Sequence, residues 1–141
     1  MVGSALIPEE SLIVGAARQL IEDRADVANV AAVVLTADGE TFAGVNVGND
    51  VGGICAEVAA LARALAVSTS RPELVAATRL DGVVTPCGRC RQLMIDRFPD
   101  IAAVVCVDGR KLILTMDGRG VAVPGAPDMV IPRAGTSRSG H

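Results

Sequence analysis

The sequence predicts an α/β fold in which a mixed β-sheet carries helices on both faces. Three helix-like segments alternate with five short strand-like runs in the order αββαβαββ, a pattern typical of a sheet covered by helices. Half of the 141 residues are hydrophobic, yet the chain contains two Phe and no Tyr or Trp. Because a chain of this length can bury roughly two-thirds of the surface that it exposes when unfolded, we expect a core of Ala, Val, Leu and Ile.

The first half of the chain predicts a helix, a hairpin and a second helix. The first helix begins at Pro8, and from Ile13 onward its apolar residues recur at i, i+3, i+4, i+7 and i+8, which predicts one buried face. Residues 30–35 and 41–47 are strand-like and flank a polar turn, so they predict a hairpin. Residues 55–67 are apolar on nearly every side. We therefore expect this helix to be buried all round, either within its own fold or against another subunit.

The second half predicts three more strands around a third helix. A strand within residues 74–84 ends at a proline, and the helix that follows, residues 89–97, stops before Pro99. Residues 101–107 and 111–116 are strands joined by a turn. We predict one domain over residues 1–132 and a polar tail, residues 133–141, that is disordered.

Charge and cysteine content restrict the possible partners. The net charge of −3 and the pI of about 5.1 provide no basic surface, which disfavours a nucleic-acid polymer as substrate. No secretory leader pattern opens the chain, and no apolar run reaches the roughly 20 residues of a membrane span, so we expect a soluble cytoplasmic protein with no membrane partner. Thiols stay reduced in the cytoplasm, so four cysteines favour a metal site over disulfides.

Three of these cysteines stand at predicted helix starts. Cys87 and Cys90 form a Cys-x-x-Cys pair after a proline, which places them one helical turn apart, and Cys55 opens the second helix within Cys55-Ala56-Glu57. Helix N-termini favour thiolate over thiol. Zinc fits three thiolates best, with a fourth position open. Glu57 does not project in the same direction as Cys55, so it should flank the metal rather than bind it.

This set of residues resembles that of the cytidine deaminase superfamily, in its small, tetrameric, three-cysteine branch. Within that branch the similarity is greatest to the blasticidin S deaminases. The matching stretches are residues 42–47, 52–57 and 86–92, and the resemblance extends from about the first helix to the strand after Cys90. It implies a three-layer fold with a five-stranded mixed sheet, a homotetramer whose active sites are completed by neighbouring subunits, and a hydrolytic deaminase with a small-molecule substrate.

The resemblance also implies roles for individual residues. Cys55, Cys87 and Cys90 would hold Zn²⁺, and Glu57 would shuttle protons. Contacts to the substrate would come from Asn46, through a hydroxyl group, and from the backbone of Ala56 and Thr85, which would face the base. For Asn46, a simple turn residue is an equally good interpretation.

Three thiolates leave the zinc site with a net negative charge that must be offset before a bound water becomes acidic. Many three-cysteine cytidine deaminases place an arginine directly after the catalytic glutamate, where this chain has Val58. As in the blasticidin S deaminases, Arg89 is the available substitute, donating to a thiolate sulfur. The alternative is a solvated surface arginine. Arg91 is expected at the surface or at a subunit contact.

The chain departs from the family where a nucleoside sugar and base would be held. The glutamate that grips the ribose is replaced by Gly48, and an aromatic residue that flanks the base is replaced near Ala28. The blasticidin S deaminases also lack that glutamate. We therefore expect deamination of a cytosine-containing nucleoside or analogue to its uracil form, of the cytidine, deoxycytidine or blasticidin S type.

Two alternatives stay open at this point. The substrate could be another amino-heterocycle, such as a free base or a purine. The protein could instead be non-catalytic, with a closed structural zinc site in which Cys106 is the fourth ligand, although Cys106 lies in an apolar strand and is expected to be a buried hydrophobic residue. The one histidine, His141, ends the chain and is not expected to take part.

Overall fold

The computed structural model describes residues 8–49, 52–116, 120–123 and 126–132. The predicted tail, residues 133–141, lies outside this part of the chain. In chain order the elements are α1 (Pro8–Arg24), β1 (Ala31–Thr36), β2 (Thr41–Val45), β3 (Val47–Asn49), β4 (Gly52–Ile54), α2 (Ala56–Val67), β5 (Pro72–Arg79), β6 (Gly82–Val84), α3 (Gly88–Arg97), β7 (Ala102–Val107), β8 (Arg110–Thr115), β9 (Gly120–Val123) and β10 (Ala126–Pro132). No helix within these residues is long and apolar enough to cross a membrane.

The central sheet is mixed, as predicted. Its strand order is β10-β9-β8-β7-β5-β1-β2, with β6 paired to β5. The β5–β7 pair is parallel, and the other pairs are antiparallel. The five predicted strands form the continuous run from β2 to β8. The sheet extends beyond this run through β9 and β10, which the sequence analysis did not predict.

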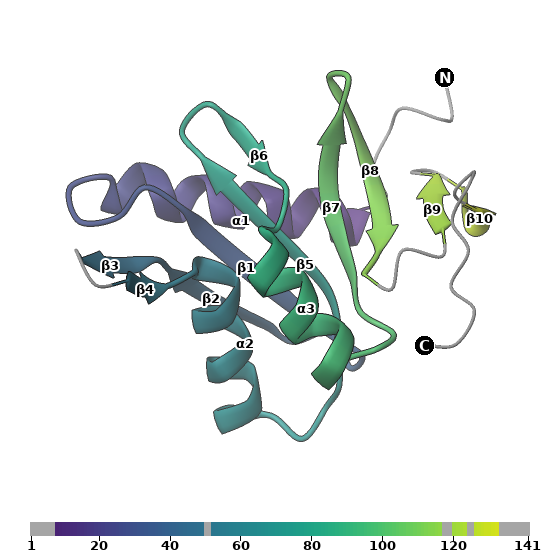
Figure 1. Cartoon of the computed structure of the whole chain (residues 1–141), viewed down its shortest axis with the longest axis horizontal. Coiled ribbons are helices and arrows are strands. Elements are labelled where there is room, and N and C mark those ends of the chain that lie inside the picture. Colours follow the sequence, from purple (N-terminus) through teal and green to yellow (C-terminus); the bar gives the residue numbers. More distant parts are fainter. Residues whose placement is uncertain (1–7, 50–51, 117–119, 124–125, 133–141) are drawn as a thin grey trace.

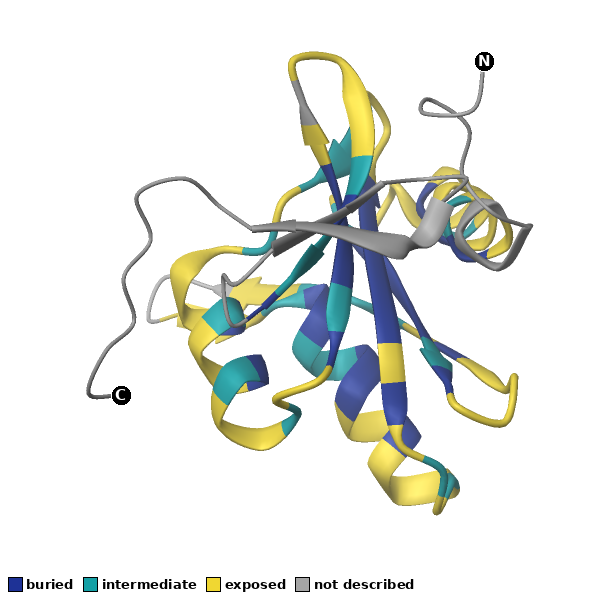
Figure 2. Ribbon diagram, turned by 90° about the vertical axis from the view of Figure 1, so that its right-hand side faces the viewer, coloured by how far each residue is buried: buried dark blue, intermediate teal, exposed yellow. Residues whose placement is uncertain are grey.

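Helices cover both faces of the sheet and complete the three predicted layers. Helix α1 lies on one face, and α2 and α3 lie on the other (Figure 1). Ile13, Ala17 and Ile21 are fully buried, which confirms the predicted apolar face of α1, and the cluster on that side includes Val33 and Leu74. Figure 2 shows the buried residues concentrated on the central strands and on the inward sides of the helices.

The core under α2 and α3 is made of small and aliphatic side chains, as the composition predicts. Phe42 is 7% exposed and belongs to this cluster. Gly44, next on the same side of β2, allows α2 to approach closely. A Cβ atom built at this position would lie 2.5 Å from the backbone nitrogen of Ala60 and 2.8 Å from the Cβ of Ala59. The position of α2 on the sheet therefore depends on the absence of a side chain at Gly44.

Helix α2 differs from its prediction. Its inward residues, such as Ala60 and Leu61, are buried, but Leu65 is 53% exposed and Val67 is 63% exposed. Of the two alternatives, enclosure of α2 within its own fold is therefore excluded, and packing of α2 against another subunit stays a prediction. Only one layer of structure covers this helix in the single chain, so its outer apolar side faces outward.

The segment between β2 and Cys55 contains a short hairpin. Strands β3 and β4 pair with each other in a separate two-stranded sheet. A Cβ at Gly53 would lie 2.2 Å from the carbonyl oxygen of Val47, so glycine is required for this pairing. The hairpin leads the chain directly into Cys55 at the start of α2.

Candidate metal centre

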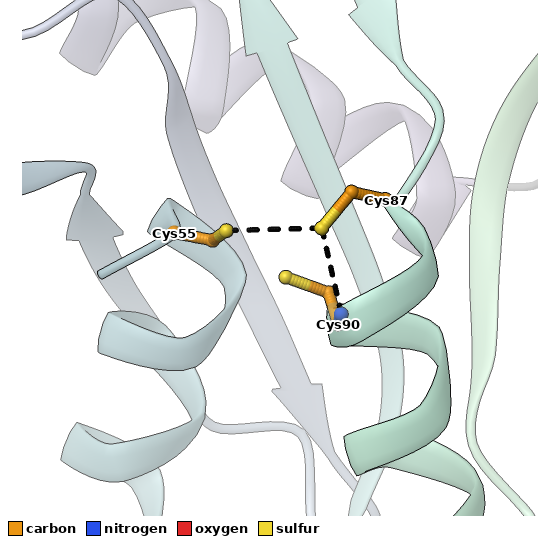
Figure 3. A group of neighbouring side chains, drawn as sticks. All are labelled: Cys55, Cys87 and Cys90. Atoms are coloured by element: carbon orange, nitrogen blue, oxygen red, sulfur yellow. Dashed lines mark hydrogen bonds between the residues drawn. The ribbon is translucent and has the colours of Figure 1, made fainter. Parts of the chain in front are cut away.

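The three predicted cysteines meet where α2 and α3 begin. Cys55 is the N-cap residue of α2, Cys87 is the N-cap residue of α3, and Cys90 lies one turn further along α3. The three Sγ atoms lie within 4.8 Å of one another, and Cys55 Sγ is 3.9 Å from Cys87 Sγ. Figure 3 shows the three side chains converging from the two helix starts.

Local backbone geometry positions these thiols and adjusts their acidity. Cys87 has an extended backbone conformation, and its Sγ accepts a hydrogen bond from the backbone amide of Cys90 at 3.5 Å. This hydrogen bond lowers the pKa of the Cys87 thiol. Burial raises the pKa of Cys90 when no cation is bound. A divalent cation would favour the thiolate form of all three residues.

The donor set and its spacing fit zinc. With Zn–S bonds of about 2.3 Å, tetrahedral coordination places two sulfur atoms roughly 3.8 Å apart. The 3.9 Å between Cys55 Sγ and Cys87 Sγ agrees with this spacing. Three sulfur ligands leave the fourth tetrahedral position open, as in catalytic zinc sites.

Cys106 does not belong to the cluster. Among the described residues, the group that could hold a metal ion contains Cys55, Cys87 and Cys90 without it. Cys106 lies near the end of β7, where it pairs with Lys111. Its apolar neighbours predicted that it would be buried, but it is exposed. A four-sulfur site that includes Cys106 is therefore not formed.

Glu57 lies beside the cysteines in the first turn of α2. It is only 4% exposed, and burial raises the pKa of its carboxyl group against the smaller opposing effect of a hydrogen bond from its own backbone amide. It is not part of the cluster of potential ligand atoms, and its place beside a bound metal stays a prediction. Such a carboxyl group can hold a proton and release it.

Arg89 reaches back from α3 to the start of α2. Its Nη2 atom donates a hydrogen bond to the carbonyl oxygen of Gly53 at 3.0 Å and lies 4.0 Å from Cys55 Sγ. The guanidinium thus lies near a thiol sulfur although the residue is exposed, and its role in offsetting the charge of the thiolates stays a prediction. Arg91, which was expected at the surface or at a subunit contact, is half-buried, and its Nε donates to the carbonyl oxygen of Met116 at 3.1 Å. This hydrogen bond connects α3 to the residue that follows β8.

An open cavity of about 340 Å³ adjoins the cysteines, which is in the size range of small-ligand sites. Glu57, Arg89 and Cys87 line it, together with the predicted substrate contacts Asn46, Ala56 and Thr85, and with Gly48, Asn29 and Arg79. Thus every predicted site residue lines this cavity except Cys90, which is buried but belongs to the same cysteine cluster. Asn29 and Arg79 are lining residues that the sequence analysis missed.

Asn46 connects the end of β2 to the segment before β1. Its Oδ1 accepts hydrogen bonds from the backbone amides of Asn29 and Val30, at 3.1 and 3.0 Å, and its Nδ2 donates to Asn29 Oδ1. Because both backbone groups are donors, they determine the orientation of the amide. The second hydrogen of Nδ2 has no hydrogen-bond partner within the described residues.

Comparison with known proteins agrees with this geometry. The family model described as "Cytidine and deoxycytidylate deaminase zinc-binding region" matches residues 9–112. A probable cytidine deaminase of Dictyostelium discoideum is 40% identical over 82 residues, which are 55% of this chain and 54% of that protein. The alignment thus spans about half the length of this curated relative.

Solved structures share the fold over most of their length. The cytidine deaminase of Mycobacterium leprae has a TM-score of 0.62 and 26% identity, covering 75% of this chain and 92% of that one. The cytidine deaminase of Burkholderia pseudomallei has a TM-score of 0.61 and 29% identity, covering 75% of this chain and 91% of that one.

Proposed function

Because this chain belongs to the cytidine and deoxycytidylate deaminase family, we propose that it is a zinc-dependent aminohydrolase acting on a cytosine-containing nucleoside or nucleoside analogue. The reaction would replace the exocyclic amino group with oxygen from water, giving the uracil form and ammonia. One observation carries the proposal: three cysteine sulfurs that fit a zinc site with an open position lie beside a buried carboxyl group at a cavity.

Each residue near the cysteines has a proposed task. When bound by Cys55, Cys87 and Cys90, zinc supplies a Lewis acid that makes water a nucleophile near neutral pH. Glu57 accepts one proton from the attacking water and passes it to the ring nitrogen beside the attacked carbon. It then takes the second proton from the hydroxyl group formed on that carbon and delivers it to the departing amine, as the C–N bond breaks and the C=O bond forms. The burial that raises the pKa of Glu57 helps it to carry a proton between these steps. Arg89 offsets negative charge through its contact with Cys55.

Substrate contacts would come from the lining of the cavity. The free Nδ2 hydrogen of Asn46 is available to a hydroxyl oxygen of the substrate, and the backbone at Ala56 and Thr85 would face the base. Gly48 lines the cavity without a side chain. In cytidine deaminases a glutamate that binds the ribose occupies the position of Gly48. Because glycine cannot make this contact, the position supports a preference, like that of the blasticidin S deaminases, for a cytosine compound other than plain cytidine.

The decisive experiment measures ammonia release from cytidine, deoxycytidine, cytosine, blasticidin S, adenosine and guanine. Wild type is compared with Glu57→Gln at matched zinc content. We expect one cytosine compound to react and Glu57→Gln to abolish turnover with zinc still bound. Glu22→Gln, an exposed change on α1 across the sheet, is the matched control and should retain full activity. If cytosine, adenosine or guanine alone reacts, the alternative amino-heterocycle substrate holds. Activity that survives in Glu57→Gln would refute the proton-shuttle role.

We also propose a homotetramer in which neighbouring subunits cover the outer side of α2. The exposed Leu65 and Val67 support this, because apolar side chains on one helix are usually covered in an assembly. Sedimentation over a concentration series should give a tetramer, and Leu65→Glu should shift it to smaller species. A wild-type monomer at all concentrations would contradict the proposal.

Two further proposals concern organisation and location. The family match over residues 9–112 supports one deaminase domain within residues 1–132. The absence of disulfides among the four cysteines supports a cytoplasmic location, where thiols stay reduced.

A further inference from the structure

Strand β2 forms one edge of the central sheet, with α1 and α2 on opposite faces of that sheet (Figure 1). The strand is five residues long, and its pairing with β1 contains no register shift. Edge strands are commonly protected against further pairing by lysine, by proline or by a bulge. Strand β2 contains none of these, so its free edge is suited to pairing with another strand.

The register of β2 determines which of its backbone groups face outward. The amide of Asn46 donates to the carbonyl oxygen of Val30, and the amide of Thr36 donates to that of Glu40. Because hydrogen-bonded pairs alternate along an antiparallel ladder, the even-numbered residues of β2 face β1. The outward backbone groups are those of Thr41, Ala43 and Val45. Within the described residues these groups form no hydrogen bond.

A groove of about 540 Å³ lies along this edge. Residues 41 and 43–45 of β2 line it, together with Leu20 and Arg24 of α1 and Arg63 of α2. It shares no lining residue with the cavity beside the cysteines. Both arginines are exposed and have no ion-pair partner within the described residues, and the lining contains no carboxylate. The groove therefore has an unneutralised positive charge on each face of the sheet.

The close packing of α2 on β2 explains the position of Arg63. A Cβ at Gly44 would lie 2.8 Å from the Cβ of Ala59, so Ala59 is on the side of α2 that faces β2. Residues four apart share one side of a helix, which places Arg63 one turn further along the same side. On the other face of the sheet, Arg24 stands in the last turn of α1.

We propose that the edge of β2 binds an extended acidic segment of another protein, which adds to the sheet as a further strand. Main-chain hydrogen bonds to the outward groups of β2 hold the backbone of this segment. Successive side chains of a strand point to opposite faces. Two adjacent Asp or Glu residues of the segment therefore reach Arg24 on one face and Arg63 on the other, where each guanidinium matches a carboxylate.

Charge argues against two other occupants of this edge. Pairing of β2 with β2 of a second copy would bring four arginines to one interface whose lining contains no carboxylate, and like charges on paired strands are destabilising. The terminal stretches outside the described residues, 1–7 and 133–141, contain no Asp or Glu. The acidic side chains therefore come from another molecule.

The first test measures binding of a fluorescein-labelled peptide, acetyl-Thr-Val-Glu-Glu-Val-Thr-amide, to the full chain by fluorescence anisotropy. Peptides with Gln-Gln or Lys-Lys in place of Glu-Glu should bind more weakly. Arg24→Gln and Arg63→Gln should each weaken binding of the acidic peptide by about 2-fold to 5-fold, the effect of one exposed ion pair. Added salt should weaken it in wild type. Arg97→Gln is the matched control, because it removes the same charge from an exposed residue outside the groove and should leave binding unchanged.

Hydrogen exchange tests the strand addition itself. In the free protein the amides of Thr41, Ala43 and Val45 should exchange faster than those of Phe42 and Gly44, which face β1. Bound peptide should slow the exchange of the three outward amides. Ala43→Pro removes one outward donor while leaving the ladder with β1 intact, since proline is tolerated on edge strands, and it should also weaken binding. The arginine variants decide the question if Ala43→Pro does not fold.

Three results would overturn the inference, and none depends on deaminase activity. The first is equal binding of the Glu-Glu and Gln-Gln peptides. The second is binding of the acidic peptide without slower exchange of the outward amides. The third is a double variant, Arg24→Gln with Arg63→Gln, that self-associates in sedimentation but binds the acidic peptide as wild type does. That result would show that the two arginines serve only to prevent pairing between copies of the chain.

Discussion

The substitution Gly44→Ala tests whether the zinc site depends on the close approach of α2 to the sheet. The added Cβ would lie 2.5 Å from the backbone nitrogen of Ala60 and 2.8 Å from the Cβ of Ala59. Ordinary contacts between such atoms are about 3.5 Å or longer, so α2 must move outward by roughly 1 Å. Both obstructing residues belong to the helix itself, and no flexible side chain can absorb the clash.

This movement has two measurable consequences. Overpacking of this kind costs about 1–3 kcal/mol, which should lower the free energy of unfolding of zinc-free Gly44→Ala in urea. The same movement carries Cys55 and Glu57 away from α3, so zinc affinity, measured by competition with a chelator, should fall as well. Activity should fall by about 100-fold, the effect of a 1 Å misplacement of reacting groups.

Gly15→Ala is the control for the change of residue type. Gly15 lies in α1 with no atom within 4 Å of a built Cβ, so alanine there should raise the free energy of unfolding by about 0.5–1 kcal/mol and leave zinc affinity unchanged. If Gly44→Ala is as stable as wild type and binds zinc equally well, the contact between β2 and α2 does not position the site.

Further predictions concern the ligand set and one surface carboxylate. Cys87→Ser should lower the amount of bound zinc, measured by atomic emission after dialysis against a chelator. Cys106→Ser should keep about one zinc ion per chain. Loss of zinc in Cys106→Ser would instead support the closed four-sulfur site. The hydrogen bond from Thr36 Oγ1 lowers the pKa of Asp38. This contact therefore stabilises the folded state above the ordinary aspartate range, about pH 4. The stabilisation is lost as the pH falls through the pKa that Asp38 has in the folded state. Thr36→Val should raise the pKa of Asp38 in an NMR titration, and an unchanged value would show that another group lowers it.

The sequence was most informative where function depends on neighbours along the chain. The Cys-x-x-Cys spacing after a proline is enough to place Cys87 and Cys90 one turn apart at a helix start, and Cys55-Ala56-Glu57 sets a ligand and a carboxylate at another. Short aliphatic runs likewise predicted the five strands β1, β2, β5, β7 and β8, because a strand or a helix face is a local pattern. The resemblance of these motifs to a family then connected the two helix starts.

The tertiary structure decided what depends on strand register and on the layers around each element. Arg79 enters the cavity only because β5 pairs with β1 in one register, and a shift by one residue would turn its side chain to the α1 face. Leu65 is exposed because a single layer covers α2, and Cys106 is exposed because it lies near the end of β7, although their sequence surroundings are apolar. Apolar neighbours show that a segment is suited to burial, but the number of layers around it is set by packing between distant parts of the chain.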